Sequence, residues 1–100
     1  MIQELYTCEI DEIAVCTNLC FANQDAANNV RLTMGVKSGG AYYPAQATAV
    51  LAAGLYKQLD NPIYIRERET LQVGFLPDGA DTDWSVWAEI HVFLIEHTKT

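Results

Sequence analysis

The feature that most constrains the fold is an alternation of apolar and other side chains with a period of two. It is clearest in residues 84–97, toward the end of the chain. Successive side chains of a β-strand point to opposite faces, so this period predicts a strand and not a helix. One face would carry Val86, Ala88, Ile90, Val92 and Leu94, and the other Trp87, Glu89, His91, Phe93 and Ile95.

The same alternation recurs in shorter segments separated by turn-forming residues. Ile13, Val15, Leu19 and Phe21 alternate with Ala14, Cys16, Asn18, Cys20 and Ala22, which predicts a long strand with one face of large apolar residues. Segments 30–36, 63–65 and 71–75 alternate in the same way, and polar or glycine-containing stretches separate them. About eight short strands with this spacing predict one antiparallel all-β domain over residues 1–100, either a sandwich or a barrel.

Residues 43–59 support two interpretations. The stretch begins near Pro44 and is rich in alanine, which favours a helix. The alternative is two short strands around a turn at Ala52-Ala53-Gly54. We favour strands because the flanking segments are strand-like, and the helix stays open as the second possibility.

Charge and composition exclude some classes of partner. The formal net charge is −7, with thirteen acidic and six basic residues, which disfavours nucleic acid and anionic membranes as partners. No apolar run approaches the roughly 20 residues of a membrane span. The first residues, Met1 to Glu4, lack the basic and apolar stretches of an export signal, so the protein is expected to remain in a cytoplasm until it is assembled.

The residues that usually carry chemistry are sparse. Cys8, Cys16 and Cys20 are expected to be reduced, buried thiols, because their number is odd and the sequence shows no export signal. Cys16 and Cys20 would share a strand face but lie too far apart to bond, and Cys8 and Cys16 could meet across a hairpin but would stay reduced in a cytoplasm. His91 and His97 would lie about 20 Å apart along one strand and cannot share a metal ion. With no nucleophile or phosphate-binding motif present, the sequence predicts neither an enzyme nor a cofactor.

Three acidic residues in the loop 77–83 offer one possible ion site. Asp78, Asp81 and Asp83 flank Gly79 and have oxygen ligands suited to calcium. Their spacing does not match a calcium-binding loop, and an acidic, solvated hairpin tip is the preferred interpretation. No metal site is therefore expected.

The last predicted strand offers a candidate interface. Only one of its faces can join the core of a two-sheet sandwich, and the sequence alone does not decide which. The face with Trp87, Glu89, His91, Phe93 and Ile95 would then be covered either by other parts of the fold or by another subunit, as apolar patches with polar neighbours often are.

The order of these segments resembles small virion proteins of tailed bacteriophages, which have a jelly-roll-like β-sandwich. The resemblance covers nearly the whole chain and follows its strands and turns. The chain departs from the family pattern at two turns, where Cys8-Glu9-Ile10-Asp11 and Glu67-Arg68-Glu69 replace the usual residues. The segments that carry the resemblance are Leu5-Tyr6-Thr7, Gly39-Gly40, Ala52-Ala53-Gly54, Asn61-Pro62-Ile63-Tyr64-Ile65, 71–75 and 86–95.

This resemblance implies a non-enzymatic structural protein of the virion. It implies a capsid decoration (cement) protein that forms a homotrimer, binds the lattice of the major capsid protein and stabilises the shell. A tail, baseplate or fibre subunit is the first alternative. A carbohydrate-binding β-sandwich is the second, with stacking platforms supplied by Tyr42, Tyr43, Trp84 and Trp87.

Overall fold

The computed structural model describes residues 1–79 and 83–95 and is built from β-strands throughout those ranges. The all-β prediction is confirmed, as is the expected number of strands. The strands are β1 (Ile2–Thr7), β2 (Glu12–Asn23), β3 (Val30–Ser38), β4 (Ala41–Leu51), β5 (Tyr56–Gln58), β6 (Ile63–Ile65), β7 (Thr70–Pro77) and β8 (Trp84–Leu94).

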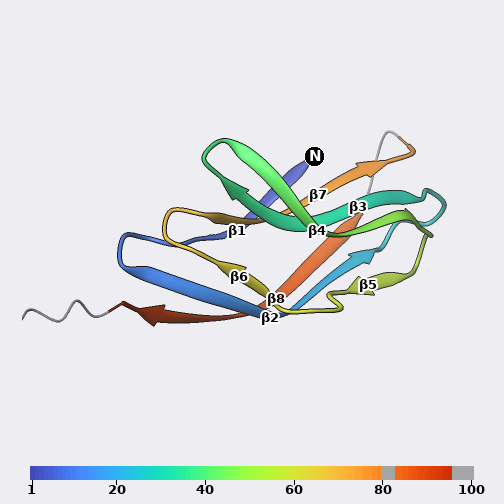
Figure 1. The fold of residues 1–100 in the computed structure, drawn as a ribbon. Coiled ribbons are helices and arrows are strands. Elements are labelled where there is room, and N and C mark those ends of the chain that lie inside the picture. Colours follow the sequence, from blue (N-terminus) through green and yellow to red (C-terminus); the bar gives the residue numbers. More distant parts are fainter. Residues whose placement is uncertain (80–82, 96–100) are drawn as a thin grey trace, which may run out of the picture.

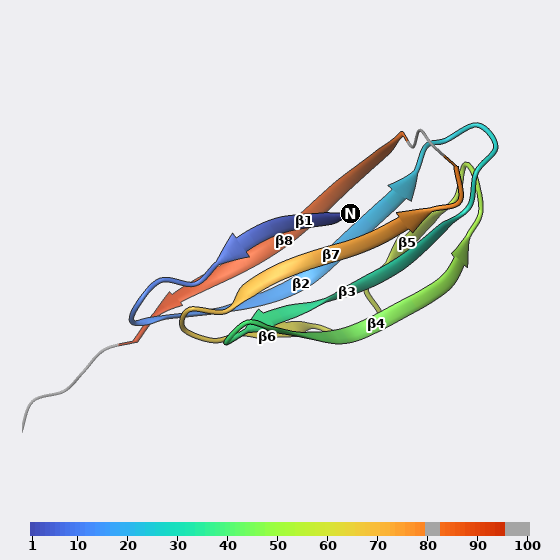
Figure 2. The ribbon, with the colours of Figure 1, turned by 90° about the horizontal axis from the view of Figure 1, so that it is seen from above.

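Two antiparallel sheets pack face to face as a sandwich (Figure 1). Sheet A has the strand order β1-β7-β3-β4. In sheet B, β2 is central: β5 and β6 pair with one of its edges in succession, and β8 pairs with the other. Seen from above, the long strands of the two layers run in similar directions, as in an aligned sandwich (Figure 2).

The strand pairs are nested in the sequence. β3 and β4 form a hairpin, β2 pairs with β5 and β6 around it, and β1 pairs with β7 around both. The folded ribbon then wraps so that β7 also pairs with β3 and β8 pairs with β2. These pairings build the two-sheet antiparallel sandwich that the sequence predicts. Among the described strands β8 pairs only with β2, so its other edge is unpaired.

The core lies between the sheets and is apolar. The alternating residues of β3 and β7 face inward as predicted, and Phe21 of β2 packs against Phe75 of β7 with ring centroids 5.2 Å apart. Trp84 closes one end of this cluster by stacking on Phe21. The largest fully buried side chains are Phe21, Leu19, Met34, Ile65, Leu71, Val30 and Val73.

The predicted faces of β2 are wrong, and a β-bulge is the reason. The register with β8 shifts between Cys16 and Asn18, so Thr17 is an extra residue and the alternation reverses there. Ahead of the bulge the small residues Ala14 and Cys16 face the core, and after it the large residues Leu19 and Phe21 do. Ile13 and Val15 therefore lie on the outer face, opposite to Leu19 and Phe21.

Residues 43–59 form strands, so the helix alternative is wrong. β4 ends at Leu51, the turn at Ala52-Ala53-Gly54 follows, and β5 begins at Tyr56. Gly54 has φ of 80°, a conformation that glycine adopts without the steric cost paid by other residues. β4 is an edge strand with little burial on either face. Because neither face has to fill a core, small alanine side chains are tolerated there and no apolar alternation is needed.

Candidate interaction surface

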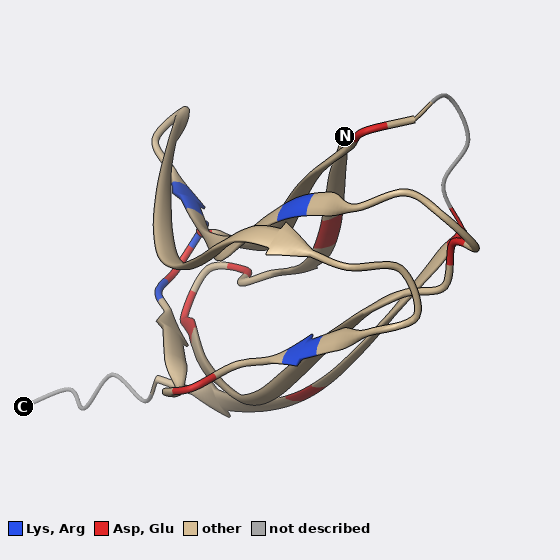
Figure 3. Cartoon of the chain, turned by 90° about the vertical axis from the view of Figure 1, so that its right-hand side faces the viewer, with Lys and Arg blue, Asp and Glu red and all other residues tan. Residues whose placement is uncertain are grey.

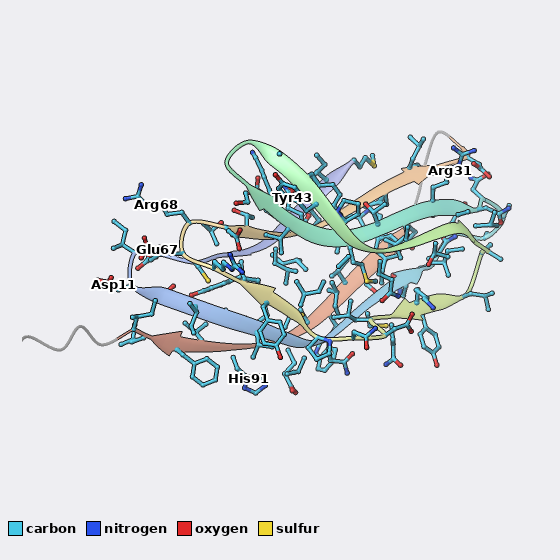
Figure 4. The ribbon with its side chains drawn as sticks, in the orientation of Figure 1. Asp11, Arg31, Tyr43, Glu67, Arg68 and His91 are labelled. Carbon is cyan, nitrogen blue, oxygen red and sulfur yellow. The ribbon has the colours of Figure 1, made fainter. Side chains whose placement is uncertain are left out.

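The five residues singled out in the last strand lie on the outer face of sheet B. Val86, Ala88 and Ile90 pack against the core, which settles which face of β8 points inward. Trp87 and Phe93 point the other way and are 56% and 54% exposed. Figure 4 shows His91 directed away from the opposite sheet. The structure therefore presents this face to solvent within a single copy of the chain.

Neighbouring strands extend this face at the Phe93 end. Ile13 of β2 pairs with Phe93, and Val15 pairs with His91 on one side and Tyr64 of β6 on the other. Tyr64 is 74% exposed. The side chains of Ile13, Val15, Tyr64 and Phe93 border a shallow pocket of about 290 Å³. We call this group the outer apolar patch.

The sequence pattern did not reveal three members of this patch. The alternation alone predicts Ile13 and Val15 on the same face as Leu19 and Phe21, and only the bulge at Thr17 moves them outward. Tyr64 belongs to a separate segment whose pairing with β2 no local pattern reports. An exposed tyrosine between two inward-facing isoleucines was the only signal in the sequence.

A polar cluster separates the outer apolar patch from Trp87. Thr17 Oγ1 donates a hydrogen bond to Glu89 Oε1 at 2.8 Å, and His91 Nε2 lies 3.2 Å from the same oxygen. The Thr17 hydroxyl and then His91 hold the pKa of Glu89 below its usual value. Glu89 is therefore a fixed carboxylate at the centre of the exposed face of β8.

The end of the candidate site is anchored to the first turn. The Ile95 amide donates to the Asp11 carbonyl oxygen at 2.7 Å, and the Asp11 amide donates to Glu67 Oε2 at 2.7 Å. Asp11 and Glu67 lie side by side at this end of the molecule in Figure 4. Ile95 is 38% exposed, so a smaller fraction of its surface is open to solvent than for Trp87 or Phe93.

The cysteines are free thiols, as expected. Burial raises the pKa of both the Cys8 and the Cys16 thiol, and their sulfur atoms face the carbonyl oxygens of Ile65 and Asn18. Cys16 and Cys20 do not share a face, because the bulge between them turns Cys16 inward and Cys20 outward. The expectation that all three are buried holds for Cys8 and Cys16, whereas Cys20 is partly exposed.

Within residues 1–79 and 83–95, no cluster of three potential metal ligands occurs. Asp81 and His97 lie outside the described residues. The Lys and Arg positions in the end-on view are spread over both layers and do not gather on one face (Figure 3). The described part of the chain also contains no helix that is long and apolar enough to cross a membrane.

The aromatic residues suggested as sugar platforms do not share a surface. Trp84 packs on the core, stacked on Phe21 and tilted against Phe75, whereas Trp87 lies on the outer face of sheet B. Tyr42 is in sheet A, where its hydroxyl donates to Thr33 Oγ1 at 3.0 Å. No single platform is therefore built from these residues.

Tyr42 does border a polar hollow on the outer face of sheet A. Gln72 lines this hollow and is only 4% exposed, yet its side-chain amide has no hydrogen-bond partner among the described residues. Buried amides are usually paired, so this one stands out. The residues around the hollow are Ile2, Glu4, Lys37, Gly40, Tyr42 and Gln72.

Comparisons of the chain with protein-family models, with curated proteins and with solved structures found no match.

Proposed function

We propose that this protein is a non-enzymatic structural component of a tailed-bacteriophage virion, made in the host cytoplasm, that decorates the assembled capsid. In this role it binds the lattice of major capsid protein and stabilises it. A ligand that binds only the assembled state favours that state by mass action. Two things support the proposal: the resemblance in segment order, and a rigid sandwich that exposes a defined apolar surface.

The observation that carries the proposal is the outer face of sheet B. Trp87 and Phe93 are large aromatic residues, both more than half exposed, on a regular strand that holds them rigidly. Exposed aromatic residues with polar neighbours are typical of protein contact sites, and Trp and Tyr often dominate their binding energy. The resemblance implies a homotrimer, whereas the surface itself requires only that another protein covers it.

The test is binding of the purified protein to mature shells that lack it. We expect wild-type protein to cosediment with such shells and to raise their melting temperature. Trp87→Ala should weaken binding by at least about tenfold, since central aromatic residues of interfaces often contribute 2 kcal/mol or more. A matched control is Tyr43→Ala, which removes a similarly exposed aromatic residue from β4 of sheet A. Equal binding by both variants would exclude the proposed surface.

A tail, baseplate or fibre subunit is the alternative within the same class. It would use the same exposed face but a different partner. Binding to purified tails and not to shells would favour this alternative, and the Trp87→Ala variant would lose that binding instead.

A carbohydrate-binding module is the second candidate function, and the hollow on sheet A favours it. The hollow combines a tyrosine ring, a carboxylate, an ammonium group and the unpaired amide of Gln72, which are groups that bind sugar hydroxyls. A glycan array probed with wild-type protein and with Gln72→Leu tests it. Hits that the variant loses would support it, and an array without hits would eliminate it.

A further inference from the structure

The unpaired edge of β8 carries free backbone hydrogen-bonding groups at alternate residues. The carbonyl oxygen of Asp83 and the amide of Ile95 bond toward the β2 side. The Glu89 carbonyl oxygen also faces Thr17 of β2. Both backbone groups of a residue in an antiparallel strand point to the same side, and the side alternates along the strand. The even-numbered residues from 84 to 94 therefore direct their N–H and C=O groups to the open edge.

Nothing in β8 protects this edge against pairing. The eleven residues from Trp84 to Leu94 include no proline, glycine or lysine, which are residues that often protect edge strands. The inward-facing side of β8 is also uncovered at its C-terminal end. Leu94 has the same parity as the inward-facing residues of this strand, yet it is 77% exposed. A strand added at this edge would satisfy the free backbone groups and cover this apolar surface.

The sequence of β8 is complementary to itself when two copies run antiparallel about Ile90. Glu89 then lies opposite His91 of the second copy, so a carboxylate meets an imidazole twice across the axis. Trp87 lies opposite Phe93 of the second copy, which is a favourable aromatic cross-strand pair. On the inner face the matched pairs are Ala88 with Val92 and Val86 with Leu94.

The backbone geometry and the charges select this register over its neighbours. Because the even-numbered residues hold the free groups, only registers that pair even with even residues form the ladder. Moving one step in one direction places Glu89 against Glu89, and moving one step in the other places His91 against His91. Centring on Ile90 is the register in which each Glu89 carboxylate faces an imidazole, and Glu89 and His91 then occupy the closer, non-hydrogen-bonded pairs.

We propose that two copies of this chain associate through their β8 edges, antiparallel and centred on Ile90, so that sheet B continues across a two-fold axis. The contact is isologous and therefore closes at two copies. It gives a dimer where the resemblance implies a homotrimer. It also places Trp87 of each copy beside Phe93 of the other, which joins the exposed aromatic residues into one surface. Only the use of that surface on a shell rests on the proposed function.

The first experiment is light scattering over a concentration series of wild-type protein and charge variants. Wild type should have twice the chain mass. His91→Glu places two carboxylates opposite each other at two positions and should weaken the dimer about tenfold or more. Glu89→Lys places an ammonium group opposite each imidazole, which removes the complementary carboxylate–imidazole pairs and should also weaken the dimer. The double variant E89K/H91E restores opposite charges and should restore the dimer. Glu4→Lys, which changes charge on β1, is the matched control and should leave the mass unchanged.

A second measurement tests the register directly through amide hydrogen exchange of β8. In the dimer, the amides of Val86, Ala88, Ile90 and Val92 should become protected, and this protection should fall when dilution separates the copies. The odd-numbered amides, which face β2, should be protected at all concentrations. Protection that does not depend on concentration would overturn the proposal.

A monomer at about millimolar concentration, or a stable trimer, would also overturn the β8 dimer. Shell binding is measured separately, so the two proposals can fail independently. A monomer or trimer that binds shells and loses binding in Trp87→Ala would leave the proposed function standing without this dimer. A β8 dimer that binds no shell would leave the dimer standing without that function.

Discussion

The two long edge strands of the sandwich, β4 and β8, are equal in length and opposite in character. Each has eleven residues. β4 contains Pro44, which has no amide hydrogen, and its pairing with β3 is interrupted by two register shifts. β8 contains no proline, and its pairing with β2 has a single shift, which arises from the extra residue in β2.

The two sides of the sandwich also differ in how they are closed. On the β4 side, Gln46 bridges the sheets: its Nε2 donates to the Gln58 carbonyl oxygen at 2.9 Å, and its Oε1 accepts from the Asp60 amide at 2.7 Å. On the β8 side, no hydrogen bond joins β1 to β8 in the described ranges. The difference teaches that the β4 edge resists pairing with a further strand, whereas the β8 edge keeps the features of a strand that can accept one.

The largest expected effect comes from Gly35→Ala, which would break the protected edge. A Cβ atom at Gly35 would overlap the Tyr43 carbonyl oxygen and lie 2.7 Å from the Pro44 Cα, and both are backbone atoms that cannot rotate away. We expect a loss of about 2–3 kcal/mol in the free energy of unfolding, from overpacking between β3 and β4. Urea denaturation followed by tryptophan fluorescence measures it.

Gly74→Ala is the matched control for that substitution. Its Cβ would approach only the Thr33 Oγ1 atom, at 2.8 Å, which is the end of a side chain that can rotate. We expect a loss below about 1 kcal/mol. If both glycine variants lost the same stability, the close approach of β4 to β3 would not be what positions that edge.

A smaller effect is expected from Gln46→Ala, which removes the bridge on the β4 side. Loss of its two hydrogen bonds should cost about 1 kcal/mol, because net contributions of hydrogen bonds are modest and the site is exposed. Gln58→Ala is the control, since Gln58 takes part only through its backbone oxygen. Thermal unfolding of the two variants side by side gives the comparison, and equal melting temperatures would show that the bridge does not hold the sheets together.

The smallest effect is expected from Tyr6→Phe on β1, which should change how the stability of the fold depends on pH. The Tyr6 hydroxyl donates to Glu12 Oε1 at 2.7 Å, and this bond raises the pKa of Tyr6 from 10.0 to about 12. The Glu9 amide, and then Tyr6, hold the pKa of Glu12 below its usual value. A raised tyrosine pKa stabilises the fold below pH 10, and this contribution is lost as the pH rises toward 12.

The lowered pKa of Glu12 acts in the opposite direction. It stabilises the fold above the ordinary glutamate pKa, and this contribution is lost as the pH falls through the lowered value. Tyr6→Phe should therefore reduce the alkaline loss of stability, of which the raised pKa values of Tyr42, Cys8 and Cys16 leave a part. It should also reduce the acid loss, which the Glu9 amide still maintains in part. Unfolding curves between pH 3 and pH 12 test this, with Tyr64→Phe as the control; identical pH profiles for wild type and Tyr6→Phe would contradict it.

Strand content, sheet type and most inward faces could be predicted because a half-buried strand requires side-chain alternation. The exceptions have physical causes. The bulge at Thr17 reverses the alternation without any change in residue type that marks it. The alanine-rich β4 lacks alternation because solvent reaches both of its faces. Its sequence therefore shows the helix propensity of alanine and no burial pattern that would indicate a strand.

The candidate site was predicted in part. The exposed face of β8 follows from one strand, because alternation separates Trp87 and Phe93 from the core residues. The open edge of β8 and the neighbours Ile13, Val15 and Tyr64 depend on which strands pair, and the pairs lie up to about 80 residues apart in the chain. No local pattern carries that information.

The nested strand order has a consequence for how the chain reaches this structure. The β3–β4 hairpin can close early, but β1 must wait for β7, and β2 receives β8 only when the last strand has been synthesised. Folds dominated by such distant pairings fold slowly, because long loops must close before their contacts form. During that interval one edge of β2 remains bare. The edge of β2 that β8 covers in the folded protein is therefore the last edge to be covered in the nascent chain.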